Sequence, residues 1–199
     1  MRMFGNHIDG AFAEYVKAPA KDAIPLPLDL PLEESCIIAD ALSTPYHAVR
    51  NRGRVRPGDT VAVFGCGGVG LNLVQGAVAA GGIVLAVDLD DGKLSLAREL
   101  GASDTVNART TDRPDKEIKR LTGGGVDIAF EAIGNPKTLS KAFDSLRRGG
   151  RLVVVGFCAD SVPWAPSKIM FHEMEVLGSL GCSPADYPAL IELVRRGRL

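Results

Sequence analysis

Four glycines near the middle of the chain have the spacing of a phosphate-binding turn. The segment Gly65-Cys-Gly67-Gly-Val-Gly70 has the pattern G-x-G-x-x-G, follows an apolar run of β type and opens a helix pattern. In such a turn the first glycine allows the tight bend, the second lets the backbone approach a pyrophosphate, and the third lets the helix pack on the strand. The free N–H groups and the dipole of the helix N-terminus attract phosphate oxygens. The motif therefore predicts a dinucleotide site, and the alternative is a tight turn that binds no ligand.

Asp88 ends the next apolar run, 18 residues after Gly70. A carboxylate at that place can accept hydrogen bonds from the ribose hydroxyls of the adenosine half, and it would repel a 2′-phosphate. The three residues that follow supply no cation, and Lys93 is the only positive charge nearby in the sequence. These residues favour NAD over NADP as the bound dinucleotide.

Apolar runs that predict strands alternate with helix patterns through the middle of the chain. Strands are expected over residues 60–64, 83–87, 105–107, 126–130, 151–155 and 175–180. Helices are expected between them over residues 68–80, 91–100, 114–121 and 136–148, the last with Asn135 as its N-cap and Pro136 at its first position. Continuous apolar strands that alternate with helices indicate a parallel sheet covered on both faces. We predict an α/β fold with a doubly wound, six-stranded parallel sheet in the order 3-2-1-4-5-6.

The two ends of the chain have a different character. Residues 1–31 contain Gly10-Ala-Phe-Ala-Glu-Tyr-Val16 and then several prolines, which is typical of edge strands and loops. Residues 32–52 predict a helix that breaks near Pro45, and residues 183–196 predict a capped helix.

Composition excludes several classes of function. The 23 Lys and Arg against 24 Asp and Glu leave a net charge of −1, so no basic excess indicates nucleic acid or an anionic membrane as a partner. The four cysteines lie far apart without a C-x-x-C pair, so we expect reduced thiols in a cytoplasmic protein. Residues 60–87 carry no charge and could span a bilayer, but their glycines favour the soluble strand, turn, helix and strand instead.

Several motifs together resemble the medium-chain, zinc-type alcohol dehydrogenase family, including its polyol and threonine dehydrogenase branches. They are Gly10-Ala-Phe-Ala-Glu-Tyr-Val16, Val55-Arg-Pro-Gly-Asp-Thr-Val61, the glycine turn, Lys93 to Gly101, Glu131-Ala-Ile-Gly134 and Arg148-Gly-Gly-Arg-Leu-Val-Val-Val-Gly156. They follow the family's order and cover nearly the whole chain. The resemblance implies a Rossmann domain in an oxidoreductase that passes hydride between an alcohol and NAD, while zinc polarises the oxygen.

The resemblance also implies that this chain is only part of such an enzyme. The family's catalytic Cys, its His-Glu pair and its four-cysteine structural zinc lobe do not occur in this sequence. We therefore expect a remnant of the β-rich catalytic domain over residues 1–40, the NAD-binding domain over 41–181, and the start of the return to the catalytic domain over 182–199. Two alternatives stay open: an NAD-binding module that is inactive on its own, and a zinc-free quinone or enoyl reductase relative.

Individual site residues follow from the resemblance. It places Asp40 at a position that ligates zinc in the family, although we expect zinc in the full-length parent and not in this chain alone. The residues expected to border the cofactor are Thr44, Gly65, Gly67, Gly68, Val69, Gly70, Asp88, Lys93, Ile133, Val155, Gly156, Phe157, Ser179 and Leu180. Ordinary core packing is the alternative for those that resemblance alone supplies. His47 is interpreted as structural, His172 is expected near a subunit contact and His7 in a loop, and no catalytic residue is assigned.

The last expected strand predicts a homodimer. Residues 175–180 follow a long connection and would lie at one edge of the sheet, where unpaired N–H and C=O groups must be covered or paired. The resemblance implies the same contact, because family dimers join two sheets across such an edge. The alternative is an edge covered by the chain's own residues 164–171. A small alcohol or carbonyl compound is the expected substrate, and the sequence does not identify which one.

Overall fold

The computed structural model describes residues 3–199, and the chain divides into two compact units between Leu30 and Pro31. Residues 3–30 form one short 3-10 helix, η1 (Ala20–Asp22), and an isolated bridge between Phe4 and Ile8. The edge strands expected in this segment do not form within residues 3–30. A strand needs a neighbour to receive its hydrogen bonds, and the prolines of this segment lack N–H groups to donate.

The second unit opens with short helical segments. They are α1 (Leu32–Ser35), η2 (Cys36–Ala39), α2 (Ser43–His47) and η3 (Ala48–Gly53), the last with π-helical hydrogen bonds. The expected break near Pro45 is wrong, because the helix is interrupted at residues 40–42 instead. Pro45 lies in the first turn of α2, where a missing N–H breaks no helical hydrogen bond.

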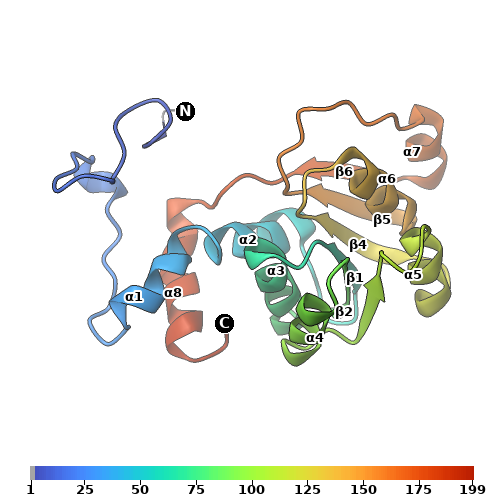
Figure 1. The fold of residues 1–199 in the computed structure, drawn as a ribbon, viewed down its shortest axis with the longest axis horizontal. Coiled ribbons are helices and arrows are strands. Elements are labelled where there is room, and N and C mark those ends of the chain that lie inside the picture. The colour runs from blue at the N-terminus through green and yellow to red at the C-terminus, as the bar shows by residue number, and fades with distance from the viewer. Residues whose placement is uncertain (1–2) are drawn as a thin grey trace. The chain divides into compact units, whose positions relative to one another are not determined.

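A six-stranded parallel sheet forms the centre of this unit (Figure 1). Its strands are β1 (Thr60–Phe64), β2 (Ile83–Asp88), β3 (Asp104–Asn107), β4 (Val126–Glu131), β5 (Leu146–Val154) and β6 (Glu175–Gly178). Their order, β3-β2-β1-β4-β5-β6, confirms the predicted doubly wound α/β fold. The order reverses between β1 and β4, and ligands of open α/β sheets bind at such a switch point.

Helices cover both faces of the sheet. They are α3 (Gly68–Ala79), α4 (Asp91–Glu99), α5 (Pro114–Thr122), α6 (Pro136–Asp144) and α7 (Pro166–His172). Along β1, Val61 and Val63 belong to one core with α3, α4 and η3, whereas Ala62 and Phe64 belong to the other with α5 and α6. Within residues 3–199 no helix has the length and the apolar character to cross a bilayer, and the cytoplasmic location stays a prediction.

The join between α6 and β5 differs from the expectation. The helix was expected to run to Arg148 and stop at Gly149-Gly150, but it ends at Asp144 and β5 already begins at Leu146. Leu146 is buried in the second core and pairs with Val126, and the register then shifts before Ile128. The two glycines lie inside β5, where Gly149 has a φ of +70° that accommodates this irregularity.

The chain ends in a helix whose start is capped as expected. Ser183 accepts a hydrogen bond from the N–H of Ala185, then η4 (Pro184–Asp186) leads into α8 (Tyr187–Arg195). The hydroxyl of Tyr187 donates to the carbonyl of Ala39 at 2.9 Å, which holds this helix against the segment before α2.

Asp115 joins α5 to α6 through ion pairs in which its own carboxylate is buried. Its side chain is nearly inaccessible, Arg113 contacts both carboxylate oxygens at 3.1 and 2.8 Å, and Lys141 of α6 lies 3.2 Å away. Burial acts against ionisation, but the hydrogen bonds from Arg113 and Lys141 outweigh it and lower the pKa of Asp115 to about 2.

We expect Asp115→Asn to lower the free energy of unfolding by about 2 kcal/mol at neutral pH. Because the pKa of Asp115 is lower in the folded state, its contribution is complete above the unfolded value of 3.8 and is lost as the pH falls toward about 2. Urea unfolding at neutral pH and in this acid range measures both effects. The matched control is Glu117→Gln on the same helix, an exposed partner of Arg120 that should change stability little. Equal acid sensitivity of Asp115→Asn and the unmodified chain would contradict this assignment.

Candidate functional site

The glycine turn connects β1 to α3, and steric contacts account for two of its glycines. Gly65 has a φ of +94°, and a Cβ there would lie 2.6 Å from Cγ1 of Ile133. A Cβ on Gly70 would lie 1.7 Å from the carbonyl oxygen of Gly65. A Cβ on Gly67 or Gly68 would meet nothing within 4 Å, so this side of the turn is open. Gly67 is also the N-cap of α3 and provides no capping side chain, which leaves the first N–H groups of the helix available to a ligand.

The Asp88 carboxylate is held beside this turn by backbone donors. Its Oδ2 accepts from the N–H of Cys66 at 2.7 Å, and its Oδ1 accepts from Leu89 at 2.8 Å and Asp90 at 3.1 Å. Burial first, and then the charge of Asp88, raise the pKa of the Cys66 thiol to about 12. Cys66 is therefore a packed thiol and not a nucleophile at neutral pH.

A pocket of 530 Å³ opens at the C-terminal ends of β1 and β2. It brings together five of the expected site residues: Gly65, Gly67, Asp88, Lys93 and Ile133. Its far wall is formed by α6 through Lys137, Thr138 and Lys141, three residues that none of the sequence motifs indicates.

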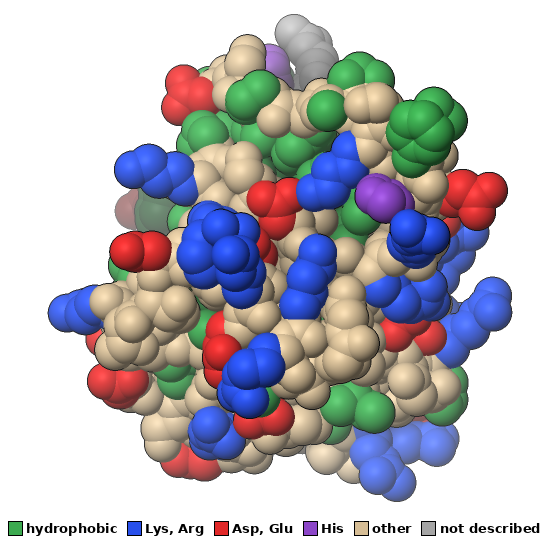
Figure 2. Space-filling view, turned by 90° about the vertical axis from the view of Figure 1, so that its right-hand side faces the viewer, with side chains coloured by type: hydrophobic (Ala, Val, Ile, Leu, Met, Phe, Trp, Pro, Cys, Tyr) green, Lys and Arg blue, Asp and Glu red, His purple; other side chains and the backbone are tan. Residues whose placement is uncertain are grey.

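The two lysines of α6 correct the view that Lys93 is the only cation near Asp88. The expected helix start at Asn135 could have revealed them, since Lys137 and Lys141 are four residues apart and so share one helix face. Lys141 is paired with Asp115, whereas Lys137 is exposed. Figure 2 looks toward α5, α6 and α7 and shows Lys and Arg side chains interspersed with Asp and Glu, so this side of the molecule is not uniformly basic.

A second pocket of 550 Å³ lies at the ends of β5 and β6. It collects the other group of expected residues: Val155, Gly156, Phe157, Ser179 and Leu180. Phe157 and Leu180 are strongly exposed there. Trp164 also lines this pocket, and its Nε1 and the Oγ of Ser179 are buried without a hydrogen-bond partner among the described residues.

The remaining expected residues lie outside both pockets. Val69 packs on the first core at the start of α3. The hydroxyl of Thr44 donates to Oδ1 of Asp40 at 2.9 Å, and Asp40 is exposed. Across residues 3–199 no group of three or more His, Cys, Asp or Glu side chains is arranged to hold a metal ion. Catalytic zinc needs three protein ligands, so the described residues do not fit a zinc ion.

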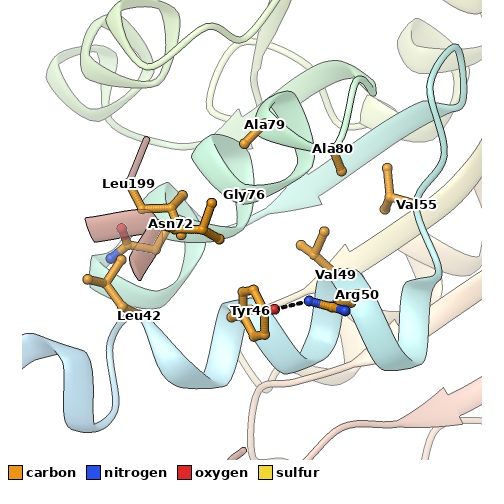
Figure 3. Close-up of a pocket in the computed structure, with 11 residues that line it drawn as sticks. Leu42, Tyr46, Val49, Arg50, Val55, Asn72, Gly76, Ala79, Ala80 and Leu199 are labelled. Carbon is orange, nitrogen blue, oxygen red and sulfur yellow. Dashed lines mark hydrogen bonds between the residues drawn. The ribbon is translucent and has the colours of Figure 1, made fainter. Parts of the chain in front are cut away.

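A smaller, mostly apolar pocket of 200 Å³ lies on another side of this unit (Figure 3). It lies between α2, η3, α3 and the chain end at Leu199. The Arg50 guanidinium donates to the hydroxyl of Tyr46 at its wall. None of the expected site residues lines it, so it is separate from the candidate site.

Comparisons with known proteins agree with this geometry. Residues 68–196 match the family model described as zinc-binding dehydrogenase. The sorbitol dehydrogenase of Bacillus subtilis (strain 168) is 36% identical over 193 residues, which are 96% of this chain and 54% of that protein. The solved alcohol dehydrogenase of Aeropyrum pernix has a TM-score of 0.91 at 33% identity, over 99% of this chain and 58% of that one. A zinc-binding dehydrogenase from Sinorhizobium meliloti 1021, solved bound to NADP, has a TM-score of 0.89 at 32% identity, over 100% of this chain and 58% of that one. The chain spans little more than half the length of each.

Proposed function

This chain belongs to the zinc-binding dehydrogenase family, and from that premise we propose that it is the NAD-binding portion of an oxidoreductase of the alcohol dehydrogenase type. The observation that carries the proposal is the open N-terminus of α3 beside the fixed carboxylate of Asp88, at the switch point of the sheet. A helix N-terminus attracts phosphates, and a carboxylate at the end of β2 accepts from ribose hydroxyls. The alcohol or carbonyl substrate belongs to the same proposal.

The two pockets divide the dinucleotide between them in this proposal. The adenosine half lies in the pocket of Asp88 and Ile133, and the pyrophosphate lies against the open backbone at Gly67 and Gly68. The nicotinamide half reaches the pocket at Phe157, where backbone at the ends of β5 and β6 orients its carboxamide. The bound cofactor supplies the hydride chemistry, and this chain's residues hold and orient it.

The choice of NAD over NADP depends on which charge dominates near the ribose. Lys137 and Lys141 add positive charge to the pocket, and one similar structure is bound to NADP. However, Lys141 is paired with Asp115, a carboxylate that it shares with Arg113, and the Asp88 carboxylate is fixed beside the glycine turn. A 2′-phosphate next to Asp88 would place like charges together, so we propose NAD.

Asp88→Ser should weaken NADH binding by about 1–3 kcal/mol, the range of hydrogen bonds to a charged group. The same change should weaken NADPH binding less or improve it, because it removes a repulsive carboxylate. Calorimetric titration of both nucleotides into both proteins measures the two changes. Asp91→Ser, at the start of α4, is the matched control for loss of an acidic residue nearby. Tighter binding of NADPH than of NADH by the unmodified chain would contradict the proposal.

A nucleotide-binding module without turnover is the second candidate for the chain on its own. It is favoured by the lack of a three-ligand metal group within residues 3–199. In that case Asp40 marks only the position at which a longer protein would place a zinc ligand. A ligand-type carboxylate there argues against the zinc-free quinone or enoyl reductase, which has no use for it. Stoichiometric zinc, or alcohol oxidation by this chain, would favour a complete enzyme instead.

The arrangement of the parent protein is also a proposal. We assign residues 1–40 and 182–199 to the flanks of the catalytic domain, and residues 41–181 to the nucleotide-binding domain. We further propose a homodimer that forms across the outer edge of β6, the last strand of the sheet, where the carbonyl of Gly178 already accepts from Nε of Arg52 at 2.7 Å.

A further inference from the structure

Glu131, the last residue of β4, is a carboxylate with no exposed surface at all. Its described partners are all neutral donors. Gly134 donates its N–H to both carboxylate oxygens at 3.0 and 3.1 Å, Ile133 donates at 3.3 Å, and the hydroxyl of Thr138 lies 2.6 Å from Oε1. A buried charge is costly unless it is well hydrogen-bonded, and a fully satisfied buried network holds the groups that it joins in one geometry.

The backbone of Glu131 also binds the chain at the end of the neighbouring strand, β5. Its carbonyl oxygen accepts from the N–H groups of Val155 and Gly156, both at 2.9 Å. One residue therefore joins the loop of residues 132–135, the first turn of α6 and the end of β5.

The loop that Glu131 holds lies between the two halves of the candidate site. Ile133 lines the pocket of Asp88 and packs closely against the glycine turn, because a Cβ on Gly65 would lie 2.6 Å from Cγ1 of Ile133. Gly134 adjoins the second pocket from the other side, since a Cβ on it would lie 2.0 Å from the carbonyl oxygen of Phe157. Any shift of this loop would therefore change both pockets at once.

We infer that Glu131, with Thr138 as its partner, is a positioning residue that holds the loop of residues 132–135 where a dinucleotide must cross from one pocket to the other. This inference rests on the proposed function. Glu131 lines neither pocket, so it acts through Ile133 and Gly134. It sets the affinity for the whole dinucleotide more than the affinity for AMP, which occupies one pocket only.

Two variants of the full chain test this inference. Glu131→Gln keeps the shape but puts an amide where donors converge, and Thr138→Val removes one hydroxyl and is the milder change. We expect Glu131→Gln to weaken NADH binding about tenfold, as loss of a supporting residue does, and to weaken AMP binding less. Thr138→Val should also weaken NADH binding, but Thr138 lines the pocket of Asp88, so the comparison with AMP is made on Glu131→Gln alone. The double variant should lose less than the sum because both changes break one network.

The control is Ser145→Ala, which removes a buried hydroxyl at the other end of α6 that donates to Ala142. It should lower stability without changing NADH affinity. Amide hydrogen exchange without nucleotide should be faster over residues 132–138 in Glu131→Gln and unchanged over β1. Wild-type exchange and affinity in both variants would overturn the inference alone. No NADH binding by the unmodified chain would overturn the proposed function, and the exchange data would still decide whether Glu131 holds the loop.

Discussion

Gly70→Ala is expected to lower the free energy of unfolding by about 3 kcal/mol, at the upper end of overpacking costs, and to abolish measurable NADH binding. The added methyl would lie 1.7 Å from the carbonyl oxygen of Gly65. Both atoms are fixed to the backbone, so no side-chain rotation relieves the contact. Either α3 moves away from β1 or the turn opens, and each change displaces the N–H groups proposed to bind the pyrophosphate. Urea unfolding and NADH titration of the variant measure the two effects.

Gly68→Ala is the matched control in the same turn. A Cβ on Gly68 meets nothing within 4 Å, and alanine is the better helix former at the start of α3. Its stability should equal or exceed that of the unmodified chain. If Gly70→Ala unfolds at the same urea concentration as Gly68→Ala, the contact between residue 70 and the Gly65 carbonyl is not the reason for a glycine at this position.

Val176→Pro is expected to convert a homodimer into a monomer while the fold survives. The N–H of Ser179 donates inward to the carbonyl of Val154. Donors alternate along a strand, so the N–H of Val176 points away from β5 to the outer edge of β6. Proline at this position removes a donor from the edge and leaves the bonds to β5 in place. Sedimentation of both proteins at tens of micromolar measures the change in mass.

Leu177→Pro is the counterpart for this edge. By the same alternation its N–H points toward β5, so the variant should lower the free energy of unfolding as well as disturb assembly. Residues 164–171 were the alternative cover for the edge. However, Trp164 and Ile169 pack on the second core, and the Trp164 ring lies 5.3 Å from that of Phe143. A monomeric unmodified chain, or a dimeric Val176→Pro, would contradict edge pairing.

The sheet was predictable because its signals are local. The strands β1, β2 and β4 are largely apolar runs, and a glycine or an aspartate marks the end of β1 and of β2. The irregular start of β5 was not predictable in this way. Residues 146–148 continue a helix pattern in the sequence, and they form the start of a strand because Leu146 is buried and pairs with Val126. Tertiary burial here outweighs local propensity.

The site residues that belong to one motif could be predicted from the sequence. The site residues that a distant helix brings to the pocket could not. The glycine turn and Asp88 are close in sequence and share a hydrogen bond through Cys66. The walls formed by Thr138 and Lys137 come from a helix whose position depends on the whole sheet. The proposed role of Glu131 could not be predicted from the sequence, because it depends on the complete burial of this side chain, and a place at the end of a strand does not indicate burial.

One dinucleotide is proposed to lie across both pockets of this chain, and the fluorescence emission of Trp164 reports whether it does. Trp164 is the only tryptophan and lines the pocket at Phe157, away from the pocket of Asp88. We predict that NADH quenches this emission in a saturable way at one equivalent per chain. AMP should compete with NADH without quenching by itself, and NADPH should require higher concentrations. The account would be contradicted by a lack of saturable quenching with NADH, or by saturation with NADPH at lower concentration than with NADH.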